Sequence, residues 1–173
     1  MTRIRQLHLY GISAVSLLFL ATGIENLVRL LIQTLASAEA TPWLWLNRGS
    51  LRQQVSFFAA LTIVNAPVWA GHWLAANRRL ADPERASPVR RFYLYLMQAG
   101  ALLFFVPGAI GLIRLPLWAA LQAPVGQPLP AALGATIGLI LVTVPIWLYH
   151  RRLAIADATA TSEAGGLGTA RRL

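Results

Sequence analysis

The 173-residue chain contains no cysteine and no lysine, and few of its residues are charged. Without cysteine, neither a disulfide bond nor a thiolate metal site can form. Only 12% of the residues are charged, whereas a soluble domain usually has about a quarter. Only six are acidic, which leaves few carboxylates for acid–base chemistry. The chain has no H-E-x-x-H motif, no Ser-His-acid set and no phosphate-binding glycine loop, so neither catalytic residues nor a metal site are expected.

What the chain has instead is apolar sequence, which makes up 57% of its residues. Four apolar stretches have the roughly 20 residues that cross a hydrocarbon core. Each should form a helix, because a chain in lipid must satisfy its own backbone hydrogen bonds. We therefore predict an all-α bundle of four transmembrane helices within residues 1–156, followed by a flexible cytoplasmic tail over residues 157–173. The stretches are Leu7–Leu31, Val55–Leu74, Phe92–Ile113 and Ala131–Tyr149.

The positive charge is concentrated in three places, and all fifteen basic residues are arginine. The clusters lie at the N-terminus, between the second and third spans, and after the fourth span, which are on one side of a four-span protein. Basic loops remain in the cytoplasm, so we predict that both termini are cytoplasmic. The net charge of +9 is therefore a topology signal, and no nucleic-acid partner is expected. The clusters are Arg3 and Arg5; Arg78, Arg79, Arg85, Arg90 and Arg91; and Arg151, Arg152, Arg171 and Arg172.

A two-span unit occurs twice, over about residues 4–80 and about residues 89–153. The segment from Ile4, IRQLHLYGISAVSLLFLATGIENLVRLL, aligns with the segment from Val89, VRRFYLYLMQAGALLFFVPGAIGLIRLP. This alignment pairs Arg5 with Arg90, Tyr10 with Tyr95, Gly23 with Gly108 and Arg29 with Arg114. Each unit has an even number of spans, so the two units insert in parallel, related by an expected pseudo-two-fold axis along the membrane normal.

The second span of each unit ends with the same motif, P-x-W-x-x-H, at a separation of 78 residues. It comprises Pro67, Trp69 and His72 in the first unit, and Pro145, Trp147 and His150 in the second. The tryptophans are predicted to anchor the helices at the membrane interface together with Tyr10 and Tyr95, because amphipathic rings favour the headgroup level.

The third span begins with R-x-x-Y-x-Y, from Arg90 to Tyr95, while the first unit has His8 in place of Tyr93. Together with P-x-W-x-x-H, this start resembles an uncharacterised family of small four-span bacterial membrane proteins, catalogued as a domain of unknown function. The resemblance covers about Arg3 to Leu153. It implies a multi-pass protein of the bacterial cytoplasmic membrane, and it implies no activity, substrate or catalytic residue.

Three functions are compatible with these residues. The first is a structural or accessory role in the bilayer, as a small subunit of a larger complex or as a homo-oligomer, with no cofactor. Respiratory and photosynthetic complexes contain small helical subunits of this kind. The G-x-x-x-G pair Gly134 and Gly138 would allow close helix packing in such a protein.

The second function is electron transfer. His72 and His150 are repeat partners at equal depth, so both could ligate a haem if their rings face inward; a quinone is the related alternative. The third is proton-coupled transport through Glu25, because an ionisable residue inside a span is a functional candidate. Its alternative role is a local ion pair with Arg29, one turn further along the helix.

Overall fold

The computed structural model describes the backbone of residues 3–37, 48–78, 82–121 and 129–170. Four long helices dominate: α1 (Arg3–Ser37), α3 (Arg48–Asn77), α5 (Pro88–Leu121) and α6 (Leu129–Ala170). A single turn, α4 (Asp82–Arg85), lies between α3 and α5. Each long helix is long and apolar enough to cross a membrane. The predicted all-α bundle of four spans is confirmed.

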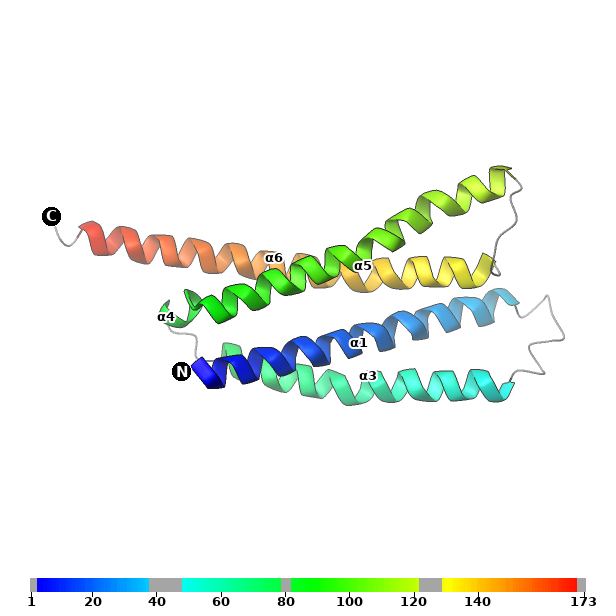
Figure 1. Cartoon of the computed structure of the whole chain (residues 1–173), viewed down its shortest axis with the longest axis horizontal. Coiled ribbons are helices and arrows are strands. Elements are labelled where there is room, and N and C mark those ends of the chain that lie inside the picture. The colour runs from blue at the N-terminus through cyan, green and yellow to red at the C-terminus, as the bar shows by residue number, and fades with distance from the viewer. Residues whose placement is uncertain (1–2, 38–47, 79–81, 122–128, 171–173) are drawn as a thin grey trace.

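The helices run up and down, so the chain is a multi-pass membrane protein with alternating span direction. The start of α1, the short helix α4 and the carboxyl end of α6 lie at one end of the bundle (Figure 1). The arginines of the described residues that form the three basic clusters therefore gather at this end, which we call the basic end. Arg79, Arg171 and Arg172 lie outside the described residues.

Helix α6 does not end where the sequence placed the domain boundary. We predicted a flexible tail from residue 157, but the helix continues to Ala170 and has 42 residues. This is about twice what the hydrocarbon core requires. Asp157, the first residue of the predicted tail, is buried. Asp157 has a buried partner in α5, described below, so the first residue of this segment belongs to the packed bundle.

The helix pair within each repeat packs through the same glycine. A methyl group at Gly23 of α1 would lie 3.1 Å from the Phe58 carbonyl oxygen of α3. A methyl group at Gly108 of α5 would lie 3.1 Å from Ile140 Cγ1 of α6. Gly23 and Gly108 are repeat partners, and each permits a close approach that a side chain would hinder. The duplicated sequence therefore produces duplicated helix pairs.

The two pairs do not join as the sequence predicted. A two-fold axis would match the α1–α6 interface with an α5–α3 interface, but only the first is formed along the helices. The helices follow the order α3, α1, α6, α5 (Figure 1). The expected pseudo-two-fold is therefore wrong for the described residues. The physical reason is the close packing of α6 on α1, which keeps α3 and α5 apart along the spans although the two helices meet at the basic end.

Candidate functional site

Arg90 connects all four long helices at the basic end. Its Nε donates to Asp157 Oδ2 of α6 at 2.6 Å, and its Nη1 donates to Tyr10 Oη of α1 at 3.1 Å. Nη1 also donates to Asn77 Oδ1 of α3 at 2.9 Å. The side chain is only 1% exposed. A buried guanidinium is tolerated when it is paired and its donors are satisfied, and here three helices supply the acceptors.

Rings from all four long helices pack beside Arg90. Trp73 of α3 stacks on Tyr93 of α5 with centroids 5.3 Å apart, and Tyr10 of α1 lies 5.1 Å from Tyr93. Trp73 Nε1 donates to Tyr149 Oη of α6 at 2.6 Å. The Arg90 guanidinium carbon lies 5.8 Å from the centre of the Trp73 ring. The basic end is therefore a packed polar and aromatic core, which we call the Arg90 cluster.

The two motif histidines lie in different surroundings. His150 is buried, with Nε2 3.4 Å from Tyr93 Oη, and its ring lies 5.9 Å from that of Trp73. His72 is half-buried and contacts His8 instead, with ring centroids 6.1 Å apart. Each Nδ1 donates to the carbonyl four residues earlier, that of Val68 or Ile146. His150 therefore belongs to the Arg90 cluster, whereas His72 lies at its margin. Ligation of a haem by both histidines remains a prediction.

The four residues predicted to anchor the helices at the membrane interface also differ in burial. Tyr95 is 63% exposed, and Trp147 is half-buried with the Arg151 guanidinium 4.8 Å from its ring centre. Trp69 is half-buried, and its buried Nε1 has no hydrogen-bond partner in the structure. Tyr10, in contrast, is 5% exposed and packs inside the bundle. The Tyr10 hydroxyl accepts a hydrogen bond from the buried Arg90, so this ring lies inside the bundle, and anchoring at the membrane interface stays a prediction for all four residues.

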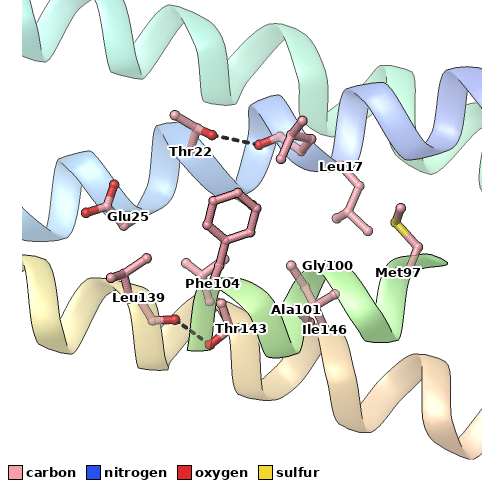
Figure 2. A pocket seen from close by; sticks show the side chains of 13 residues that line it. Leu17, Thr22, Glu25, Met97, Gly100, Ala101, Phe104, Leu139, Thr143 and Ile146 are labelled. Atoms are coloured by element: carbon pink, nitrogen blue, oxygen red, sulfur yellow. Dashed lines mark hydrogen bonds between the residues drawn. The ribbon is translucent and has the colours of Figure 1, made fainter. Parts of the chain in front are cut away.

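An apolar pocket of about 270 Å³ lies between α1, α5 and α6, toward the middle of the spans (Figure 2). Leu17, Phe104 and Ile146 are among the side chains that line it, and Glu25 lies at one end. The Thr143 hydroxyl also lines the pocket, and it donates to the Leu139 carbonyl of its own helix. The pocket is large enough for a small lipophilic molecule, and Glu25 is the one ionisable residue that lines it.

Glu25 is linked to Arg29 through a third side chain. Asn26 Nδ2 donates to Glu25 Oε2 at 2.7 Å, and Arg29 Nη2 donates to Asn26 Oδ1 at 2.8 Å. The buried Arg29 Nε has no hydrogen-bond partner in the structure. The amide therefore bridges the acid and the base, and the predicted i,i+4 arrangement is a chain of three groups.

Gly134 and Gly138 lie against α1 beside this chain. A methyl group at Gly134 would lie 2.8 Å from the Arg29 carbonyl oxygen, and one at Gly138 would lie 2.8 Å from the Glu25 carbonyl oxygen. Real Cβ atoms essentially never come so close to another atom. The two glycines therefore set the distance between α1 and α6, and this interface joins the two repeats.

Sequence reasoning missed the role of Arg90, which we counted only as a topology signal. Asp157 gave one usable clue, because it is one of only six acidic residues and lies seven positions after His150. Residues seven apart share a face of a continuous helix. The turn-like composition after Asp157 favours a tail, however, and this hides the relation. Among the described residues, no group of three or more His, Cys, Asp or Glu side chains could hold a metal ion.

The comparisons with known proteins identify a family and add no activity. No curated protein and no solved structure matches the chain. The model of a domain of unknown function does match, over residues 6–141. This range extends from the start of α1 to the middle of α6 and includes the R-x-x-Y-x-Y start of the third span together with the first P-x-W-x-x-H motif. The chain therefore belongs to the DUF5671 family.

Proposed function

We propose that this protein is a membrane-embedded structural or accessory component, held in a bacterial cytoplasmic membrane with the basic end in the cytoplasm. The single observation that supports this most is the Arg90 cluster. The Arg90 side chain donates to α1, α3 and α6, which uses its hydrogen-bonding capacity to hold helices together. A site for chemistry would instead leave reactive groups accessible to a substrate.

The exterior supports the same proposal, because large apolar side chains cover it along the spans. Phe57 and Ile63 of α3 and Leu103 and Ile113 of α5 are examples of exposed residues. Such helices are suited to lipid and to the faces of other membrane helices. An accessory subunit acts by occupying a place in an assembly, and its function requires a rigid shape and a compatible surface.

The test is extraction of the native membrane in a mild detergent, followed by mass spectrometry of whatever co-purifies. We expect the tagged protein to migrate with a larger membrane complex. Arg90→Gln should reduce this association, because Arg90 is buried and its loss loosens the packed basic end, whereas Arg91→Gln at the exposed neighbouring position should retain it. Recovery of the unmodified protein free of other membrane proteins, at the size of its own micelle, would contradict an accessory role.

A second candidate function is proton-coupled transport of a small lipophilic molecule. It is favoured by one observation, the position of Glu25 at the end of the apolar pocket. A carboxyl group beside a lipid-facing pocket can exchange a proton as an occupant binds or leaves. In this role Asn26 and Arg29 would stabilise the ionised form through the hydrogen bonds described above.

Substrate-dependent proton release from the detergent-solubilised protein tests this candidate. With a lipophilic amine as the probe, we expect release from the unmodified protein and none from Glu25→Gln. Arg91→Gln, which removes an exposed charge at the basic end, is the matched control and should behave like the unmodified protein. Equal release from Glu25→Gln would eliminate the candidate.

A further inference from the structure

The internal repeat shows that two helix faces of this chain lack the partners that their equivalents have. Helix α1 is covered on two sides: Gly23 faces α3, while Glu25 and Arg29 face α6. Residues two positions apart on a helix point in directions about 200° apart, so these are opposite sides. Helix α1 is therefore an inner helix in the order α3, α1, α6, α5, which we call the row.

Helix α5 is the repeat equivalent of α1, but at the level of Gly108, beyond the Arg90 cluster, it is covered by α6 on one side. Gly108, the partner of Gly23, faces α6. Ile110 and Arg114 occupy the positions of Glu25 and Arg29, and both are exposed, Ile110 by 54%. The α5 surface that corresponds to the α6-binding surface of α1 is therefore open.

The same comparison identifies an open surface on α3, the repeat equivalent of α6. Helix α6 uses Gly134 and Gly138 to pack on α1, and the residues at these positions in α3 are Ser56 and Ala60. Both are exposed. They retain the spacing of two small residues four apart that permits close packing in lipid.

We propose that α3 of a second copy of this chain packs on α5, repeating between copies the α1–α6 interface that joins the repeats within one copy. The chain's own α3 meets α5 at the basic end, through the Asn77–Arg90 hydrogen bond and the Trp73–Tyr93 stack, but along the spans it packs on α1. The open faces of α5 and α3 lie at opposite ends of the helix order, so the contact is head-to-tail, and α3 of the second copy covers the open α5 face of the first. The inference rests on the proposed function and deepens it, because it names a second copy of the chain as a partner.

The side chains suit such an interface. Ile110 replaces Glu25, so the contact contains no carboxylate, and the Arg114 guanidinium on the same face lies over the Trp118 ring, 3.8 Å from its centre. Ser56 and Ala60 carry a Cβ, so the two helices would lie farther apart than α1 and α6, where a methyl group would come within 2.8 Å of the backbone. Both helices run antiparallel, as α1 and α6 do, which keeps the two copies in the same orientation in the membrane.

The chain has no cysteine, so disulfide crosslinking in native membranes tests the proposal directly. Ala60→Cys and Ile110→Cys would be made in separate, differently tagged chains and expressed together. We expect oxidation to yield a species of twice the chain mass that carries both tags. The matched control combines Ala60→Cys with Leu112→Cys, which is exposed by 53% but about 200° from Ile110 on the helix, and it should crosslink at least tenfold less.

Two further measurements keep the outcomes distinct. Ala60→Leu adds bulk to an exposed position and should abolish the dimer without unfolding the chain, as judged by an unchanged thermal transition of the monomer.

With both cysteines in one chain, crosslinking at the monomer mass would mean that α3 closes on its own α5, and this would overturn the proposal. Equal crosslinking by the control pair would overturn it as well. Co-purification of a larger complex does not depend on these outcomes, so the two proposals fail separately.

Discussion

At the scale of single residues, Arg90 shows that an arginine at the end of a span can pack inside the bundle instead of extending to the lipid headgroups. An arginine at the end of a span can extend its side chain to the headgroups and leave the interior apolar. Arg5, its repeat partner, is exposed in this way. Arg90 turns inward because Asp157, Tyr10 and Asn77 offer acceptors there, and the same repeat position therefore has two different roles.

Replacing Arg90 by Gln should strongly destabilise the fold. The substitution leaves the buried carboxylate of Asp157 without its charged partner, and breaking a buried pair in this way typically costs about 3 to 5 kcal/mol. The measurement is the free energy of unfolding in detergent micelles. Arg91→Gln is the matched control, since that neighbour is exposed and should change stability by less than about 0.5 kcal/mol. Equal stability of the two variants would show that Arg90 does not tie the helices together.

At the scale of helices, the glycines determine which elements can touch. Gly23 and Gly108 are at repeated positions and make the repeated pairs α1–α3 and α5–α6. Gly134 and Gly138 have no glycine partners in the first repeat, and they make the interface that occurs once. The asymmetry of the row therefore follows from two positions at which the repeats differ.

Gly138→Ala should weaken the contact between the repeats. The added methyl group would lie 2.8 Å from the Glu25 carbonyl oxygen, and relieving such overpacking typically costs about 1 to 3 kcal/mol. Gly71→Ala is the control, because a methyl group there meets nothing within 4 Å; it should leave stability unchanged or raise it by up to about 1 kcal/mol. The readout is again the unfolding free energy in micelles. If both substitutions stabilise, then α1 and α6 do not approach as closely as described.

At the scale of the whole molecule, the chain has a packed end and an open end. The Arg90 cluster joins α1, α3, α5 and α6 at the basic end, whereas α5 diverges from α6 toward its carboxyl end (Figure 1). A second pocket, lined by Pro107, Arg114 and Ala132 among others, lies between those two helices. The basic end is therefore expected to be the most rigid part of the bundle, with looser packing at the other end.

The orientation of this asymmetric molecule in the membrane can be measured by cysteine labelling in a chain without native cysteines. Intact spheroplasts carrying Gly49→Cys should react with a membrane-impermeant maleimide, and those carrying Arg152→Cys should react only after permeabilisation. Both positions are exposed and lie near opposite ends of the bundle. The reverse labelling pattern would place the basic end outside the cell and contradict the cytoplasmic orientation predicted from the arginines.

The amino-acid sequence by itself determined the spans and the duplicated pairs. Apolar length decides that a segment crosses lipid, because an unpaired backbone is too costly there. The repeated glycines Gly23 and Gly108 give each pair the same contact. These are local properties that any reader of the sequence can recover, and the four helices and their alternating direction follow from them.

Only the tertiary structure decided how the pairs join and what the basic end contains. The positions of Tyr10, Asn77 and Asp157 in the sequence do not reveal that they meet at Arg90, since the hydrogen bonds form between helices far apart in the chain. Helix order likewise depends on which of several apolar faces pack most closely, and the apolar character of a span does not reveal this. In lipid the choice between such faces is made by shape and by a few polar contacts, and these become visible only when the helices are placed together.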